Sequence, residues 1–209
     1  MAKDAKKPQI RAIYKVAGFL AFIMLGYLGI RSYRLSVEKM KINMCIDQMG
    51  DLLYNIREKF RNERSGYAEL NYQTAVSMNI IPKSMFKEGF REAVNPYLGG
   101  VDFWYSSLGT EDDYLAFEIS FQGLSSFGCQ ELMKIQWDEG LNKDFIAVAG
   151  YANATPSGVL DLIFADMQQK DIKSFNIFKS SENHYIPQTK LDSICACKDL
   201  TCTVVWKFK

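Results

Sequence analysis

The sequence predicts an α+β protein in which one long N-terminal helix packs on a mainly antiparallel β-sheet head. Three observations support this class: an uninterrupted apolar run, a following stretch with apolar residues at steps of three and four, and later segments that alternate apolar and polar residues. We expect four parts: a basic cytoplasmic leader at 1–15, a transmembrane segment at 16–30, an amphipathic spine helix at 31–64 and a globular extracytoplasmic head at 65–209.

The leader is basic, and the segment after it is apolar without interruption. The leader carries Lys3, Lys6, Lys7, Arg11 and Lys15 against a single acid, Asp4. Positive charge before an apolar segment places the N-terminus in the cytoplasm. The run "VAGFLAFIMLGYLGI" spans a little over about 20 Å as a helix, and its apolar neighbours with a snorkelling Lys15 extend it toward the ~30 Å of a bilayer core.

Four interpretations of this run are open: a core helix, a discarded signal, a permanent membrane anchor, or a subunit handle cut between Gly18 and Phe19. A helix that is apolar on all sides, with cations at both ends, favours the membrane over a soluble core. No small-residue cleavage site of the A-x-A kind follows the run. We therefore expect the run to stay attached to the residues that follow it.

The spine continues the helix without a break, so we expect one helix from about residue 10 to residue 64. Gly66 is the predicted stop, and Gly50 weakens the middle by about 1 kcal/mol relative to alanine. Cys45 lies on the apolar face, where we interpret it as a small buried residue. That face comprises Ile42, Cys45, Ile46, Met49, Leu53, Ile56 and Phe60.

The head begins with short segments: a helix at 73–78, a turn at 95–100 and a strand from Val101. Strict alternation over 114–121 then predicts a strand with one buried face. Leu115, Phe117, Ile119 and Phe121 form the predicted buried face, and Tyr114, Ala116, Glu118 and Ser120 form the other.

The second half of the head completes the predicted sheet. We expect a helix at about 128–139, a short buried strand within 144–150, a short helix or turn within 189–197 and a terminal strand at 201–209. Residues 155–169 fit a helix, because Thr155-Pro156 suits a helix start, but their apolar density also fits a strand.

Four cysteines lie in the predicted head: Cys129, Cys195, Cys197 and Cys202. Their spacing lacks the paired knuckles of a zinc site and no histidine accompanies them. Disulfides are favoured outside the cytoplasm. Cys129 bonded to Cys195 or Cys197 would close a loop of about 66 residues, and the remaining cysteine would reach Cys202.

The composition disfavours catalysis, cofactors and nucleic acid as the primary partner. The net charge is +1, so no global basic field is present. The single histidine, His184, cannot build a histidine-rich metal site, and no nucleophile elbow or phosphate-binding loop accompanies it. The acids Glu111, Asp112, Asp113, Asp161 and Asp166 lack EF-hand spacing, so we expect no metal site.

The order of these parts resembles the type IV pilins, and among them the type IVb subunits or a minor pilin-like subunit. The resemblance rests on the basic leader before Gly18-Phe19, the stripe "MKINMCIDQMGDLLYNIREKFRNERSGY", the segments "YQTAVSMNIIPKSM" and "NPYLGGVDFWY", and the C-terminal "CQELMKIQW", "LDSICAC" and "TVVWKF". It covers most of the chain. Two departures stand out: Ile23 occupies the position of the family's glutamate, and Arg31 ends the apolar run early.

The resemblance implies a non-catalytic structural subunit of a bacterial pilus that serves adhesion, conjugation, DNA uptake or secretion. It implies prepilin processing between Gly18 and Phe19, packing with copies of itself and with other pilins, and partnership with a prepilin peptidase and an assembly platform. The implied location is the inner membrane with a periplasmic head, and then an extracellular pilus. The alternative is an uncleaved bitopic membrane protein whose periplasmic head is a binding or scaffold module of an envelope machine.

Overall fold

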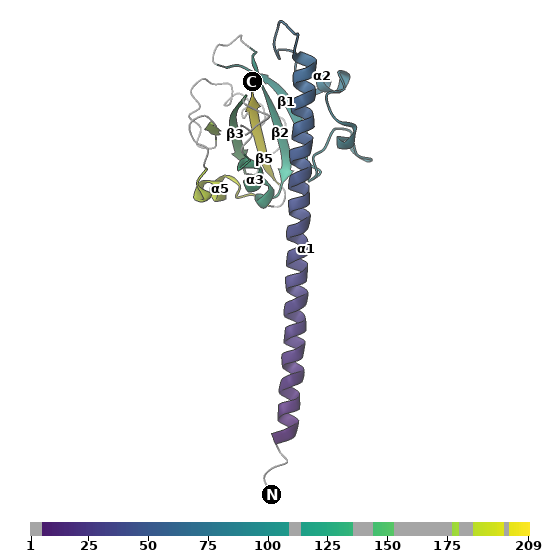
Figure 1. Cartoon of the computed structure of the whole chain (residues 1–209), viewed down its shortest axis with the longest axis vertical. Coiled ribbons are helices and arrows are strands. Elements are labelled where there is room, and N and C mark those ends of the chain that lie inside the picture. The colour runs from purple at the N-terminus through teal and green to yellow at the C-terminus, as the bar shows by residue number, and fades with distance from the viewer. Residues whose placement is uncertain (1–5, 109–113, 136–143, 153–176, 180–185, 199–200) are drawn as a thin grey trace. The chain divides into compact units, whose positions relative to one another are not determined.

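The structure is a computed structural model that describes residues 6–108, 114–135, 144–152, 177–179, 186–198 and 201–209. The chain divides into two compact units, Met1–Met40 and Lys41–Lys209, and each is described by itself. The helices are α1 (Lys6–Phe60), α2 (Tyr72–Ser77), the 3₁₀ helix η1 (Lys83–Met85), α3 (Ser126–Met133) and α5 (Gln188–Ile194). The strands are β1 (Val101–Ser106), β2 (Ala116–Leu124), β3 (Phe145–Tyr151), β4 (Ile177–Lys179) and β5 (Cys202–Phe208), and Figure 1 labels most of these elements.

Helix α1 confirms that one helix joins the apolar and amphipathic segments, but it ends at Phe60, before the predicted end. Gly66, the predicted stop, lies in the turn after the helix. Its φ of +60° is left-handed, and a Cβ there would lie 2.5 Å from the carbonyl oxygen of Tyr114. The neighbouring Tyr67 N–H donates to that same oxygen at 2.8 Å. Gly66 therefore allows a close backbone approach in the turn after the helix.

The second unit has a core formed by the C-terminal part of α1 and one face of the sheet. From α1 the buried apolar residues are Ile42, Cys45, Met49, Leu52, Leu53, Ile56 and Phe60. Ile46, which was predicted on this face, is half-buried, and Leu52 is buried on the face instead.

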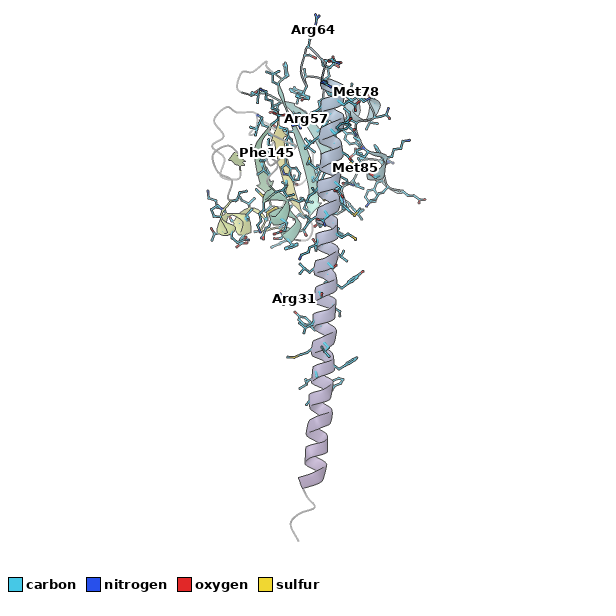
Figure 2. The ribbon with its side chains drawn as sticks, in the orientation of Figure 1. Arg31, Arg57, Arg64, Met78, Met85 and Phe145 are labelled. Atoms are coloured by element: carbon cyan, nitrogen blue, oxygen red, sulfur yellow. A yellow bond between two sulfur atoms is a disulfide. The ribbon has the colours of Figure 1, made fainter. Side chains whose placement is uncertain are left out.

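Burial raises the pKa of the Cys45 thiol to about 12, and the charge of Lys41 lowers this pKa by a smaller amount. The Cys45 thiol therefore stays protonated in the core. Arg57, which Figure 2 labels, forms an ion pair of 3.5 Å with Asp144.

The sheet has five strands in the order β1-β2-β5-β3-β4, and every neighbouring pair is antiparallel. The C-terminal strand β5 thus lies in the middle, between β2 and β3 (Figure 1). In the β2–β5 pair Glu118 lies opposite Lys207 and Ile119 lies opposite Trp206. This arrangement confirms the predicted α+β class with a mainly antiparallel sheet.

The expectation that β2 has only one buried face is wrong. Leu115 precedes the strand and is 48% exposed, whereas Ala116, Glu118 and Ser120 are fully buried. The opposite face of the sheet is covered as well, and it is lined by small and polar residues. They include Ala147 and Ala149 of β3 with Thr203, Val205 and Lys207 of β5. The polar residues of the alternation are therefore buried rather than exposed to solvent, and Glu118 lies opposite Lys207 across the β2–β5 pair.

Several head elements differ from their predicted bounds. Helix α3 begins at Ser126, because the Ser125 hydroxyl caps it by accepting from the Gly128 N–H at 2.9 Å, and it ends at Met133. Helix α5 forms within the predicted 189–197 segment but begins at Gln188. The short strand β4 was not predicted. Residues 155–169, for which helix and strand were both open, lie outside the described residues.

The predicted turn at 95–100 is organised by one buried side chain. The Asn95 Oδ1 accepts from the Tyr97 N–H at 2.8 Å, and its Nδ2 donates to the Gln122 carbonyl at 2.6 Å. Asn95 is fully buried. These bonds tie the turn before β1 to β2.

Asn95→Ala is expected to lower the free energy of unfolding by about 2–4 kcal/mol, because it leaves buried backbone groups without partners. Asn95→Asp keeps the Oδ1 acceptor but places a second acceptor oxygen against the Gln122 carbonyl at a buried site, so it should cost at least as much as the alanine variant. Denaturant unfolding followed by tryptophan fluorescence measures both. Equal stability of wild type and Asn95→Ala would contradict this role.

Gly50→Ala is expected to raise the free energy of unfolding by about 0.5–1 kcal/mol, because glycine has the larger conformational entropy when unfolded. Nothing lies within 4 Å of a Cβ built at Gly50. Gly128→Ala is the matched contrast, because its Cβ would lie 2.6 Å from the Tyr97 hydroxyl oxygen. That variant should lose about 1–3 kcal/mol through overpacking. Thermal unfolding of the two variants should therefore shift in opposite directions.

Candidate assembly surface and disulfide region

In the first unit, α1 presents an apolar surface to solvent on all sides. Every described residue from Ala17 to Ser36 is exposed. The large apolar side chains with the greatest exposure are Phe19 at 65%, Phe22 at 75%, Met24 at 71% and Leu25 at 69%. A continuous exposed apolar surface of this kind marks an interaction site.

The residues predicted for processing and register lie on this surface. A Cβ built at Gly18 would contact nothing within 4 Å, and Phe19 and Ile23 are both exposed. After Asp4, the next carboxylate in the sequence is Glu38. Ile23 is uncharged, and no residue from Val16 to Ile30 carries a charge.

The sequence predicts a membrane-spanning segment at residues 16–30. Among the described residues, no helix combines the length and the apolar character needed to span a membrane.

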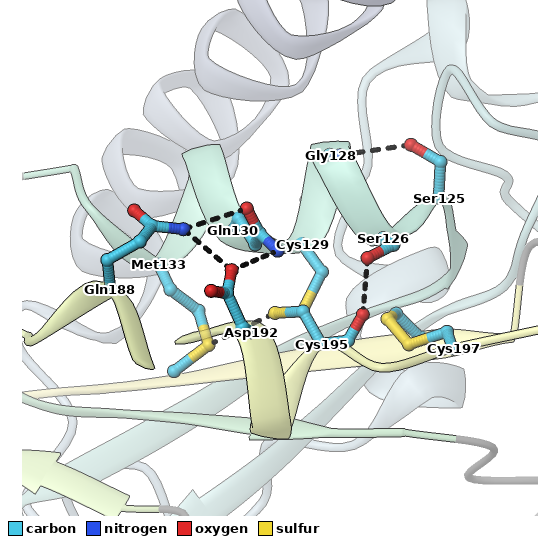
Figure 3. Close-up of a disulfide and its surroundings, with 11 residues drawn as sticks. Ser125, Ser126, Gly128, Cys129, Gln130, Met133, Gln188, Asp192, Cys195 and Cys197 are labelled. Carbon is cyan, nitrogen blue, oxygen red and sulfur yellow. Dashed lines mark hydrogen bonds between the residues drawn. A yellow bond between two sulfur atoms is a disulfide. The ribbon is translucent and has the colours of Figure 1, made fainter. Parts of the chain in front are cut away.

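In the second unit, two disulfides hold the C-terminal region (Figure 3). Cys129 of α3 is bonded to Cys195, which caps the C-terminal end of α5. Cys197 is bonded to Cys202, the first residue of β5. The sequence left the partner of Cys129 open between Cys195 and Cys197, and the structure has the Cys195 pairing.

Hydrogen bonds join the same elements around the disulfides. The Ser126 hydroxyl of α3 donates to the Cys195 carbonyl at 2.5 Å. On the exposed side, the Gln188 amide of α5 donates to Gln130 at 3.2 Å and to Asp192 at 2.8 Å (Figure 3). Helices α3 and α5 are thus linked covalently and by polar contacts next to the first residues of the central strand.

The sulfurs of this region gather closely. The Sγ atoms of Cys129, Cys195 and Cys202 lie within 4.8 Å of one another. All three belong to disulfides, so they are not thiolates that could ligate a metal. With these cysteines oxidised to disulfides, the region is a structural cross-link.

The head also contains a buried acid that the sequence did not single out. Glu118 of β2 is fully buried opposite Lys207 of β5, which is 3% exposed. Burial raises the pKa of Glu118 to about 8, while the Ser106 hydroxyl and Lys207 act in the opposite direction. Among the described residues, neither carboxylate oxygen has a partner with hydrogen-bond geometry.

Glu118 and Lys207 beside it are both buried, so neither charged group is exposed to solvent in this structure. The alternation of β2 placed Glu118 on the predicted solvent face. The signal that could have revealed it is the lysine at the matching position of the terminal strand, since both carry a charge on the face opposite the core.

The remaining acids and the histidine considered from the sequence are His184, Glu111, Asp112, Asp113, Asp161 and Asp166, and all lie outside the described residues.

Comparisons with known proteins agree with this geometry. A family model described as PilS N terminal matches residues 40–169, which is more than half of the chain. A solved structure with the same arrangement is the crystal structure of TcpA, a type IV pilin from Vibrio cholerae El Tor biotype. It is 15% identical, covers 81% of this chain and 99% of its own, and superimposes with a TM-score of 0.55. No curated protein matches the chain.

The long helix and the antiparallel sheet therefore have the fold of a type IV pilin. The chain belongs to the PilS N-terminal family.

Proposed function

We propose that this chain is a non-catalytic structural subunit of a type IV pilus or a pilus-like filament. The observation that carries the proposal is the exposed apolar surface of α1 from Phe19 to Ile30, in a chain with the pilin fold. Such a surface is stable in water only when lipid or protein covers it. The same segment in neighbouring subunits provides that cover inside a filament.

The proposed pathway has a membrane stage and a filament stage. Before assembly, the basic leader lies in the cytoplasm, the apolar segment is held by the inner membrane and the head lies in the periplasm. A prepilin peptidase cleaves between Gly18 and Phe19. An assembly platform then adds the subunit to copies of itself and to other pilins, and the finished pilus is extracellular. Adhesion, conjugation, DNA uptake and secretion are the roles that such a filament serves.

A second candidate is an uncleaved bitopic protein whose periplasmic head serves as a scaffold of an envelope machine. The observation that favours it is Ile23, which places an apolar side chain where the pilin resemblance calls for a glutamate. This candidate retains Met1 and forms no filament.

The deciding experiment is co-expression with a prepilin peptidase, followed by N-terminal sequencing and electron microscopy of sheared surface material. A chain that begins at Phe19 and antibody-labelled filaments are the expected results. Gly18→Leu should block cleavage, whereas Gly29→Leu should not, and a Cβ at either glycine meets nothing within 4 Å. A chain that keeps its leader and makes no filaments would contradict the pilus subunit and favour the scaffold.

A further inference from the structure

The second unit contains a face of α1 that no part of the described chain covers. It consists of Met44, Asp47, Asp51, Tyr54 and Glu58, which we name the acidic stripe. Steps of three and four place these residues on one side of the helix, opposite the buried core face. All five are exposed, with Tyr54 at 68%, and every exposed charged residue between 43 and 58 is an acid.

The first unit contains the opposite charge on the same helix. Arg31, labelled in Figure 2, and Arg34 are exposed and lie three residues apart, so they share one face of α1. Asp47 and Asp51 are four residues apart. The two pairs therefore have nearly the same spacing along a helix axis, about 4.5 and 6 Å.

None of these four side chains has an ion-pair partner within the described part of the chain. The ion pairs found there join Arg57 with Asp144 and Lys134 with Glu131. The arginines and the acidic stripe are thus available to a second molecule.

The apolar segment of α1 cannot by itself decide how two helices align. No charge occurs between Val16 and Ile30, and the hydrophobic effect that covers this segment is itself non-directional. Charged groups supply register, because opposite charges attract at one offset and like charges repel at others.

We propose that Arg31 and Arg34 of one copy lie against Asp47 and Asp51 of a second copy of this chain, and that this contact sets the stagger of neighbouring subunits. Asp47 is 16 residues after Arg31, and Asp51 is 17 residues after Arg34. The two offsets differ by one residue, so a single alignment of two parallel copies brings both pairs of opposite charges together. This inference rests on the proposed filament function and names the contact that orders it.

The direction of the contact has a structural consequence. A parallel, staggered contact uses two different surfaces, so each copy offers its free arginines and its free stripe to further copies, and the assembly stays open. An antiparallel contact between the same charges would be self-complementary and would close at a dimer. A filament requires the parallel form.

A charge swap tests the contact in cells that assemble the chain, with filaments counted by microscopy and by immunoblots of sheared material. Arg34→Glu and Asp51→Arg should each lower the filament yield about tenfold, because each places like charges in contact. The double variant, Arg34→Glu with Asp51→Arg, should restore the yield to within about twofold of wild type. Glu69→Arg makes the same charge change at an exposed residue outside the stripe and should assemble normally.

The outcomes separate the inference from the proposed function. Wild-type filaments together with normal assembly of both single variants would overturn the inference and leave the pilus function standing. Failure of the double variant to recover, with wild-type levels of subunit in the membrane, would also overturn it. An absence of wild-type filaments would overturn the function and the inference together.

Cross-linking provides a second readout that does not depend on yield. In a Cys45→Ala background, Arg34→Cys with Asp51→Cys should give a non-reducing ladder that extends beyond dimers. Arg34→Cys with Glu69→Cys should give none. A ladder that stops at the dimer would show the closed, antiparallel contact and overturn the stagger, and so would the absence of any cross-link.

Discussion

Glu118→Gln is expected to raise the free energy of unfolding at pH 8, and the gain should grow as the pH rises from about 4.5 to about 8. Burial raises the pKa of this carboxyl from an ordinary 4.5 to about 8. Between these two values the folded chain keeps a proton that the unfolded chain has lost. Wild-type stability therefore falls as the pH rises from about 4.5 to about 8 and levels off above that range. Glutamine has the same shape, is neutral in both states and removes this dependence.

The measurement is denaturant unfolding of wild type and Glu118→Gln at several pH values from 5 to 9. The difference between the two curves should vanish toward pH 4.5 and grow toward pH 8, which separates Glu118 from the other acids. Lys207→Met is the companion variant: it removes the charge that lowers the pKa of Glu118, so its curve should level off at a higher pH. If Glu118→Gln instead costs about 3–5 kcal/mol at pH 8, the pair is ionised and stabilising.

Removing the disulfide between Cys129 and Cys195 is expected to lower the free energy of unfolding by about 4 kcal/mol. The two cysteines are 66 residues apart in sequence. A cross-link over so long a loop restricts the unfolded chain strongly, and its loss also frees the link between α3 and α5. The double variant Cys129→Ala, Cys195→Ala is preferred to single changes because it leaves no unpaired thiol to react.

The second disulfide is the matched control. Cys197 and Cys202 are five residues apart, so Cys197→Ala with Cys202→Ala should cost only about 2 kcal/mol in the same chain-entropy model. Pulse proteolysis in denaturant measures both variants on the full chain in mild detergent. Equal losses for the two disulfides would contradict the loop-length explanation, and local packing would then set the stability.

These two features make the central strand β5 the structural centre of the head. Its first residue is held by a disulfide, and its Lys207 faces the buried acid of β2. Strand β5 pairs with β2 on one side and β3 on the other, so losing it would divide the sheet. We expect the head to depend on the C-terminal residues more than on any other strand.

Local pattern in the sequence was sufficient for the class of fold and for the two different halves of the long helix. An uninterrupted apolar run, followed by apolar residues spaced three and four apart, predicts a single helix with an apolar half and an amphipathic half. Helix α1 has that form. Alternation in residues 114–121 and 201–209 predicted β2 and β5. These properties depend on neighbours in sequence, which is why they can be read without a structure.

The tertiary structure decided which residues meet across long separations. Alternation cannot distinguish a polar face in water from a buried polar face, so it places Glu118 on the solvent side, whereas the structure buries Glu118 opposite Lys207. Spacing alone could not choose between Cys195 and Cys197 as the partner of Cys129, because they lie only two residues apart. The position after α5 decides it, since Cys195 caps that helix beside α3.

The sequence by itself thus determined a long helix with an exposed apolar half and an antiparallel head, because periodicity encodes which side of an element is buried. Only the tertiary structure decided that β5 is central, that both sheet faces are covered and that Gly66 serves a backbone contact rather than a helix stop. Those properties arise from contacts between residues tens of positions apart, and no local pattern records such contacts.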